Sequence, residues 1–261
     1  EPGRMPFWRG DTPGRPLEFG RAIGQLTREL LQQPRDVAES TLATSHCLEP
    51  RAARNLMDYL CEQREATGVP PSDRTIVVET FLDEIGDWRV VILSPFGARV
   101  HAPWAIAVGA RLRNDLTGDL DMVWGDDGIV FRIPESDDTP DPQDLFPDPE
   151  EIEEMVVRER GGTAMFASHF RENAARALLL PRRQPGRRTP LWMQRRKSAD
   201  LLKVAARYDQ FPISLETLRE CLRDVFDLPG LRGVLEEVRR REIRVHALQS
   251  ETPSPLSLIH I

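Results

Sequence analysis

The sequence predicts an α+β fold: a helical bundle with a small, mostly antiparallel β-sheet inserted between an N-terminal and a C-terminal helical part. Apolar residues recur at helical spacing before residue 70 and again after residue 149. Between these parts, β-branched runs are joined by short glycine-containing turns, which is typical of hairpins. The composition, 40% hydrophobic and 30% charged over 261 residues, predicts a globular chain of one large or two modest domains.

Composition also excludes some classes of protein. The sequence contains no run of eighteen apolar residues, so it predicts no membrane span. Its first residues also lack the apolar core of a signal peptide. The chain begins with Glu1 rather than Met, so we expect a fragment. Cys47, Cys61 and Cys221 are odd in number and have no CxxC spacing, which indicates reduced thiols of a cytosolic protein. We therefore expect a cytosolic protein.

Residues 1–16 are rich in Gly, Pro and Arg and predict an extended connector. Phe7 and Trp8 lie between Arg4 and Arg9 in this connector. Two adjacent aromatics in a polar loop either fill a core elsewhere or offer a face for stacking on bases. Taken alone, the pattern slightly favours the core.

Residues 17–70 predict the N-terminal helical part, which we interpret as scaffold. An amphipathic helix over residues 17–33 ends at Pro34. A short helix or turn over residues 36–43 follows. A further helix opens at Glu49 or Pro50 and ends near Gly68.

Residues 74–134 predict a small, mostly antiparallel sheet that carries one helix. The first hairpin joins residues 74–82 to residues 88–96 through a loop containing Gly86. We expect the next two elements to be a third short strand over residues 98–103 and a helix over residues 102–115 with Pro103 in its first turn. A second hairpin, over residues 120–134, turns at residues 125–128.

Residues 135–148 predict an acidic, proline-rich loop. From residue 135 to residue 154 the chain has ten carboxylates and no basic residue. Such a segment binds a hard cation only with suitable spacing, and the order of a calcium loop is missing. A solvated loop is therefore the better interpretation, and we expect no metal site. Asp148 and Pro149 then predict a helix start, as cap and first residue.

Residues 149–250 predict the C-terminal helical part. The helices expected after the first one span residues 163–180, residues 198–208, a segment capped by Ser214, and residues 231–241. Residues 228–230 predict a turn between the last two, and residues 242–248 alternate as a final strand. Residues 256–261, LSLIHI, match the translation of a sequencing adapter, so we expect a non-native tail there.

A strongly basic, proline-punctuated stretch follows the helix predicted to end at Leu180. From residue 181 to residue 203 it holds eight basic residues and one acid, although the whole chain has a formal charge of −7. Trp192 lies in its middle and precedes the next predicted helix. Basic residues around an aromatic suggest a surface for a nucleic-acid backbone. Alternatively, the stretch is a solvated loop, or some of its arginines pair with the acidic segment. Trp192 could equally be a core anchor.

Catalytic motifs are missing from the sequence. We find no phosphate loop, no DExD/H motif, no GxSxG and no metal-ligand spacing, and each histidine is isolated. We therefore expect the fragment alone to be non-catalytic and to have a binding function. A metal-dependent nuclease that uses the acidic loop is the least favoured alternative.

Four long motifs carry a resemblance to a known family: PFWRGDTPGRPLEFGRAIG, VHAPWAIAVGARL, FRENAARALLLPRR and TPLWMQRRKSADLLKVAARYDQFPISLETLRECLRDVFDLPGL. Together, over residues 1–255, they resemble the large helicase-related (Lhr) proteins. The similar part is their DEAD/H-associated region, which follows two RecA-like motor domains and a winged helix.

The resemblance implies a parent that is a superfamily 2 ATP-dependent translocase. Such proteins track 3′-to-5′ along single-stranded DNA, displace the paired strand and are linked to DNA repair, and the bacterial examples favour RNA:DNA hybrids. ATP and magnesium bind in the motor domains, which this chain lacks. The present region completes the single-strand channel with the winged helix. An aromatic of this region stacks on the tracking strand and couples hydrolysis to unwinding, and Trp8 best matches it.

We therefore predict an accessory nucleic-acid-binding region of a helicase. Its expected partners are single-stranded DNA, an RNA:DNA or DNA duplex, and the upstream domains, with no membrane. A structural or protein-interaction module without nucleic-acid contact is the alternative. The predicted binding residues are Arg4, Phe7, Trp8, Arg9, Arg182, Arg183, Arg187, Arg188, Trp192, Arg195, Arg196 and Lys197.

Overall fold

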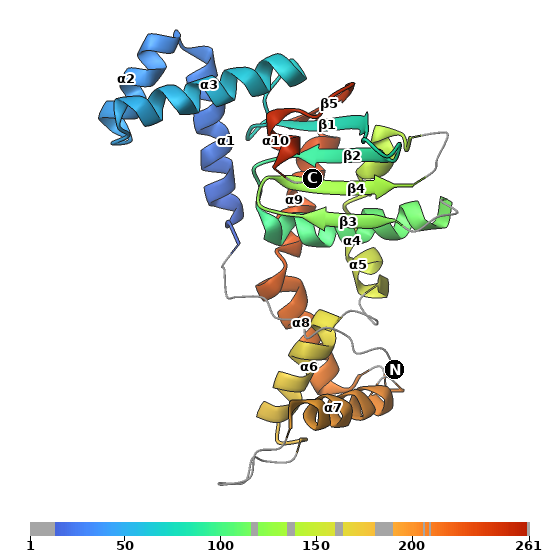
Figure 1. Cartoon of the computed structure of the whole chain (residues 1–261). Helices are drawn as coiled ribbons and strands as arrows, with labels where there is room; N and C mark the ends of the chain where they lie inside the picture. Colours follow the sequence, from blue (N-terminus) through green and yellow to red (C-terminus); the bar gives the residue numbers. More distant parts are fainter. Residues whose placement is uncertain are drawn as a thin grey trace. The chain divides into compact units, whose positions relative to one another are not determined.

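The computed structural model describes residues 14–115, 120–134, 139–159, 164–180, 190–205, 207–208 and 210–259 (Figure 1). The chain divides into two compact units, each described by itself. Of the described residues, those within 14–155 and 228–259 form the sheet unit, and those within 156–227 form the helical unit. No helix in the described ranges combines the length and apolarity needed to cross a membrane.

Three helices open the sheet unit, close to their predicted positions. They are α1 (Leu17–Gln32), α2 (Arg35–Ser45) and α3 (Pro50–Thr67). Their apolar faces share one core around Leu30, Leu42 and Met57. Pro34 and Pro50 fall at helix starts, where the missing N–H needs no partner. Helical periodicity was sufficient to predict this part.

One five-stranded sheet follows, in the order β3-β4-β2-β1-β5. Its strands are β1 (Thr75–Leu82), β2 (Trp88–Leu93), β3 (Asp121–Trp124), β4 (Gly128–Ile133) and β5 (Arg244–Gln249). Both predicted hairpins are confirmed as antiparallel pairs, β1 with β2 and β3 with β4. The predicted last strand is also confirmed, and it pairs in parallel with β1, so that Thr75 lies opposite Arg244. The sheet is therefore mixed.

The third short strand predicted over residues 98–103 is wrong, because that segment is the first part of α4 (Ala98–Asp115). Gly97 turns the chain with φ +94°, and the N–H of Ala98 donates to Asp126 Oδ1 at 2.9 Å, which caps the helix start. Pro103 lies in the helix interior rather than in its first turn. Residues 100–108 are buried almost without exception, so no polar face marked the helical period.

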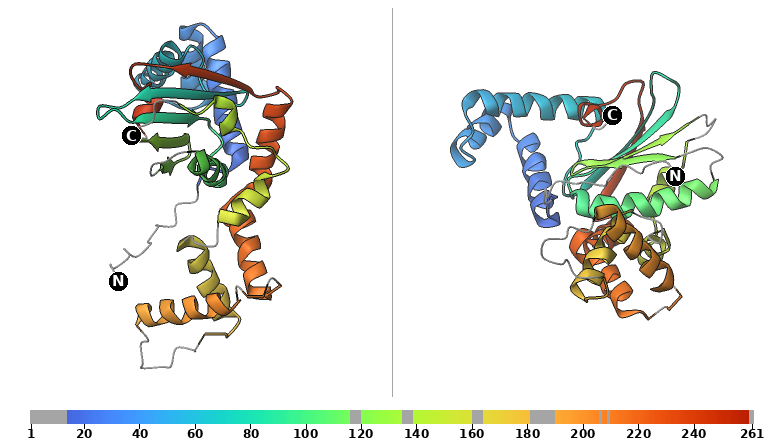
Figure 2. Two further views of the ribbon diagram at one scale, coloured as in Figure 1. Left: turned by 90° about the vertical axis from the view of Figure 1, so that its right-hand side faces the viewer. Right: turned by 60° about the horizontal axis from the view of Figure 1, so that its bottom comes forward.

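Both faces of the sheet are covered. The helices α4 and α9 (Leu228–Arg239) pack together against one face (Figure 2). On the other face, Val77, Phe81 and Val91 form an apolar cluster to which Leu256 of α10 (Pro255–Leu258) is added. Leu256 belongs to the segment predicted as a non-native tail.

The acidic segment contains more order than a plain loop. The short 3₁₀ helix η1 (Pro142–Leu145) is capped by Asp141, whose side chain accepts from the N–H of Gln143. Asp148 accepts from the N–H of Glu150 at 3.1 Å, but this contact closes a turn before the next helix, so the helix cap predicted at Asp148 is wrong. The α-helix α5 (Ile152–Glu159) begins after an intervening turn, three residues beyond the predicted first residue, Pro149.

The helical unit contains α6 (Ala164–Arg176), α7 (Leu191–Ala205), α8 (Pro212–Glu220) and the π-helical turn η3 (Cys221–Val225). The helix α6 ends earlier than predicted, since Leu178 adopts a left-handed backbone with φ +61°. The cap predicted at Ser214 is wrong, because α8 already begins at Pro212. The turn predicted at residues 228–230 is also wrong, because these residues form the first turn of α9.

Candidate nucleic-acid interface

The helix α7 carries the predicted binding residues that the structure describes. It begins at Leu191, whereas the sequence predicted a start at Ser198. The carbonyl oxygen of Pro190 accepts from the N–H groups of Met193 and Gln194 at 3.0 and 3.2 Å, which fixes the first turn. Trp192 therefore belongs to this turn instead of preceding the helix.

One side of α7 is anchored in the core of the helical unit. Ala205 is buried in a cluster with Phe166, Phe170 and Ala174 of α6, and Leu201 and Leu202 pack against it. Phe166 and Phe170 stack with ring centroids 6.5 Å apart. Burial on this side holds α7 in one orientation, so its opposite side must face solvent.

The solvent side of α7 presents an aromatic and a row of basic side chains, which we call the α7 basic face: Trp192, Arg195, Arg196 and Lys203, with Lys197 at its border. These residues are all exposed, and Trp192 has 61% of its surface accessible. Positions 192, 195, 196, 199 and 203 follow the i, i+3, i+4, i+7, i+11 spacing of a single helix face. The small Ala199 in the middle leaves the space over the face open.

The exposure of Trp192 decides between the two roles that the sequence left open. A core anchor would be buried, so that interpretation is wrong within the described part of the chain. A tryptophan that is mostly accessible and flanked by arginines is suited to stacking on a flat ligand. It also leaves the indole N–H available to solvent or to a partner.

The positive charges of the α7 basic face are not neutralised locally. Among the described residues, Arg195, Arg196 and Lys197 form no ion pair with a carboxylate. The acidic segment pairs elsewhere, Asp144 with Arg111 at 2.9 Å and Glu150 with Arg239 at 2.8 Å. The predicted pairing of the basic stretch with the acidic segment would join two separate units, so it stays a prediction.

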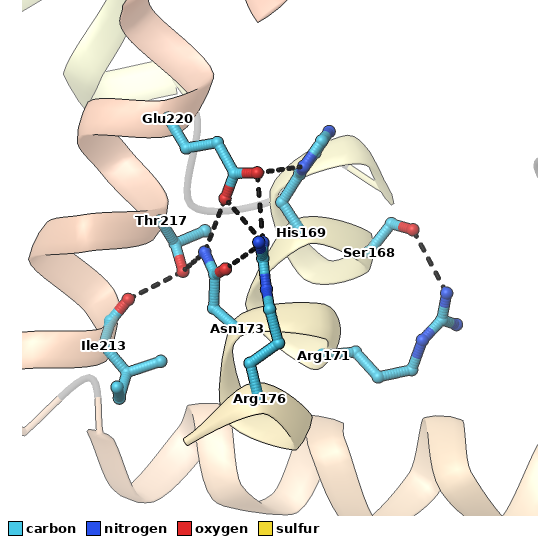
Figure 3. Close-up of polar contacts among 8 residues, drawn as sticks. All are labelled: Ser168, His169, Arg171, Asn173, Arg176, Ile213, Thr217 and Glu220. Atoms are coloured by element: carbon cyan, nitrogen blue, oxygen red, sulfur yellow. Dashed lines mark hydrogen bonds and ion pairs between the residues drawn. The ribbon is translucent and has the colours of Figure 1, made fainter. Parts of the chain in front are cut away.

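A polar network joins α6 to α8 in the same unit (Figure 3). Glu220 accepts from Asn173 Nδ2 at 2.7 Å and from Arg176 at 3.2 Å, and His169 Nδ1 lies 3.7 Å from the same carboxylate. Asn173 also donates to Thr217 Oγ1 at 3.0 Å, and the Thr217 hydroxyl donates to the carbonyl of Ile213. The side chains of Asn173, Arg176, Thr217 and Glu220 are thus hydrogen-bonded to one another, whereas His169 Nδ1 is buried without a hydrogen-bond partner among the described residues.

The network shifts the ionisation of its carboxylate. Partial burial by itself would raise the pKa of Glu220, but hydrogen bonds from Asn173 and Arg176, with the nearby His169, outweigh burial. The net effect lowers the pKa of Glu220 below its ordinary value, so the group is an anion at neutral pH. The Glu220 carboxylate is bonded to side chains of α6 within the helical unit, so it holds α6 in place rather than binding a ligand.

A serine–histidine pair in the sheet unit is structural, although its geometry resembles part of a catalytic triad. His101 Nε2 lies 2.6 Å from Ser94 Oγ, and its Nδ1 lies 2.7 Å from the carbonyl oxygen of Gly125. Because that carbonyl only accepts, Nδ1 carries the proton and Nε2 accepts from Ser94. Both side chains are buried, which prevents substrate access, and burial lowers the pKa of His101 to about 4.

The remaining predicted residues lie outside the described part of the chain. They are Arg4, Phe7, Trp8, Arg9, Arg182, Arg183, Arg187 and Arg188. The described ranges contain no cluster of three His, Cys, Asp or Glu side chains suited to a metal ion. Lys203 was counted in the basic stretch but not named as a binding residue, and its helical spacing from Trp192 and Arg196 was the signal for it. The exposed Tyr208 was missed because no pattern marks it.

Comparison with known proteins identifies the family. Residues 70–257 match the model of the family described as "DEAD/H associated". The chain is 51% identical over 258 residues to the Lhr helicase/probable uracil glycosylase of Mycolicibacterium smegmatis, covering 98% of this chain and 17% of that protein. It is 44% identical over 255 residues to the Lhr helicase/uracil glycosylase of Escherichia coli K12, covering 97% of this chain and 16% of that protein.

A solved structure agrees with these relatives. It is described as Mycobacterium smegmatis helicase Lhr bound to ssDNA and AMP-PNP, and it matches with a TM-score of 0.88 at 49% identity. The match covers 99% of this chain and 33% of that one. The chain thus spans about a sixth of the length of the two curated relatives. It belongs to the DEAD/H associated family, as the region that it shares with the Lhr helicases.

Proposed function

We propose that this chain is the accessory nucleic-acid-binding region of a superfamily 2 ATP-dependent helicase that moves 3′-to-5′ along single-stranded DNA during DNA repair. The observation that carries the proposal is the α7 basic face, where Trp192 and exposed cationic side chains share one side of a helix. The structural relative whose description includes single-stranded DNA supports the same partner.

The chemistry of a single strand fits this face. Each cation placed on a phosphate releases condensed counterions, and an exposed aromatic adds stacking on a base. Along an α-helix the seven steps from Arg196 to Lys203 span about 10 Å, so the face reaches more than one phosphate of an extended strand. With a chain charge of −7, binding of a polyanion depends on such a local concentration of positive charge.

In this proposal the chain binds and positions the strand, and hydrolysis belongs to other domains. ATP and magnesium act in RecA-like motor domains upstream, and the winged helix shares the single-strand channel with this region. The names of the relatives, which are helicases, support such a parent protein in the cytosol or nucleoid. A DNA duplex or an RNA:DNA hybrid is the substrate that the parent would open.

The N-terminal aromatic segment contributes a second contact. Trp8 stacks on the tracking strand and couples ATP hydrolysis to unwinding, with Phe7, Arg4 and Arg9 beside it. Its support is the resemblance of the PFWRGD motif to the position of the coupling aromatic in Lhr proteins. The arginines at positions 182, 183, 187 and 188 extend the phosphate contacts next to α7.

Salt-dependent binding of single-stranded DNA tests the proposal. Fluorescence anisotropy of labelled dT20, titrated with the chain at several salt concentrations, should give an affinity that falls linearly on a logarithmic plot. If the chain shows no salt-sensitive binding of dT20, the region is a structural or protein-interaction module instead.

A further inference from the structure

A second cationic surface lies in the sheet unit, far in sequence from α7. The strands β1 and β5 are parallel and start at the same end of the sheet, where the N–H of Arg244 donates to the carbonyl oxygen of Arg74 at 2.9 Å. Arg241 ends the preceding turn, and the buried Ile243 fixes the chain between it and Arg244. We call Arg74, Arg241 and Arg244 the strand-start patch.

The patch has an excess of positive charge. Arg241 and Arg244 are exposed and form no ion pair among the described residues. Arg74 reaches Asp73 only at 3.8 Å, because Arg28 already holds that carboxylate through two hydrogen bonds of 2.8 and 3.0 Å. Glu242 is the acidic residue of the segment 241–244, so positive charge exceeds negative charge where the two strands start.

The neighbouring arginines, unlike Arg241, form ion pairs with carboxylates of the described residues. Arg239 binds Glu150 at 2.8 Å, and Arg240 lies 3.6 Å from Glu236. Arg241 instead adopts a left-handed backbone with φ +62°, at the position after a helix where glycine is favoured. A long cationic side chain at a strained position indicates a use for that side chain.

We infer that the strand-start patch binds the sugar-phosphate backbone of a nucleic-acid duplex. This inference rests on the proposed function. Single-strand sites combine basic groups with stacking aromatics, whereas a duplex presents its phosphates outward and its bases inward. Neither residues 73–78 nor residues 239–249 contain Phe, Trp or Tyr, so this patch has no platform for an unpaired base.

Charge removal at the patch tests the inference in the 261-residue chain. The variant R74Q/R241Q/R244Q should bind a labelled 20-base-pair DNA duplex about tenfold more weakly near 100 mM salt. The slope of log K against log salt should become shallower by roughly 2.5, as expected for three lost phosphate contacts. Its affinity for dT20 should stay within twofold of the unmodified chain.

A second variant separates charge from folding. Arg241→Gly removes one cation and gives the left-handed position to the residue that adopts it most easily, so stability should be kept or raised. The duplex slope should still fall by about 1. The matched control is R35Q/R219Q/R232Q, which removes three exposed arginines that are already paired with Glu39, Glu216 and Glu236.

Three outcomes would overturn the inference: a duplex slope equal to that of the control, an equal loss of dT20 affinity, or no salt-sensitive duplex binding by the unmodified chain. In each case the proposed function is judged separately, because it depends on dT20 binding through α7. A loss confined to the duplex supports the strand-start patch.

Discussion

Asn173 Nδ2 on α6 donates a 2.7 Å hydrogen bond to the Glu220 carboxylate at the end of α8. The same nitrogen donates to Thr217, so one amide of α6 bonds two residues of α8 that lie more than forty positions later in the sequence. Asn173 is 7% exposed, and its loss would leave a partly buried carboxylate and a buried hydroxyl with fewer partners. The support of the α7 basic face therefore includes a polar contact besides apolar packing.

Replacing Asn173 should destabilise the helical unit. Asn173→Ala should lower the free energy of unfolding by about 1–3 kcal/mol, the cost of leaving buried polar groups without partners. Urea unfolding followed by circular dichroism measures the change. Arg171→Ala is the control, since among the described residues Arg171 bonds only Ser168 in the same helix, and its effect should stay below about 0.5 kcal/mol. Equal losses of unfolding free energy in the two variants would show that the hydrogen bonds of Asn173 add no stability beyond that of an exposed helix residue.

His101 should make the chain less stable in mild acid. Its folded pKa of about 4 lies below the value of about 6.5 expected in the unfolded chain, so the unfolded state binds the extra proton. The contribution of His101 to stability is complete above pH 6.5 and is lost as the pH falls towards 4, on the order of 3 kcal/mol in all. Urea unfolding at pH 7, 6, 5 and 4 should show a weaker pH dependence for His101→Gln. Parallel curves for the two proteins would contradict the assignment.

Trp192 should contribute to binding but not to folding. Trp192→Ala should weaken dT20 binding by about 1–3 kcal/mol, the usual contribution of an aromatic stacked on a base, while Trp192→Phe keeps most of it. Because the side chain is largely exposed, the thermal midpoint should hardly change. Leu215→Ala, an exposed apolar change on α8, serves as the control and should bind normally. Normal binding by Trp192→Ala would remove the stacking role.

Trp8 should act in the full-length protein. Trp8→Ala should impair unwinding, or the coupling of ATP hydrolysis to unwinding, while circular dichroism shows an intact fold. The physical reason is the loss of a stacked contact with the tracking strand, about 1–3 kcal/mol for one base. Unwinding at the unmodified rate would count against this role.

Local patterns predicted most of the fold. The helices α1 to α3 follow from apolar periodicity, because each has one buried and one exposed side. Both hairpins follow from β-branched runs joined by turn residues. The helix α4 was missed over its first turns because its residues are buried all round, which erases that contrast. The partner of β5 was not predictable either, because β1 lies about 170 residues earlier and nothing local marks a parallel pair.

The candidate site was only partly predictable. The concentration of arginines around Trp192 located it, but the placement of Trp192 on the solvent side depends on which face of α7 meets Phe170 of α6. The strand-start patch was not predicted, since Arg74 and Arg244 become neighbours only through sheet pairing. The network around Glu220 depends on the same kind of contact between distant segments.

The central claim is that the α7 basic face holds a single strand, and the salt dependence of dT20 binding by R195Q/R196Q/K197Q tests it most directly. Removing three phosphate contacts should reduce the steepness of log K against log salt by about 2 for single-stranded DNA. The control R35Q/R219Q/R232Q changes the net charge equally and should keep the original slope. A slope for the α7 variant equal to that of the control would contradict the account.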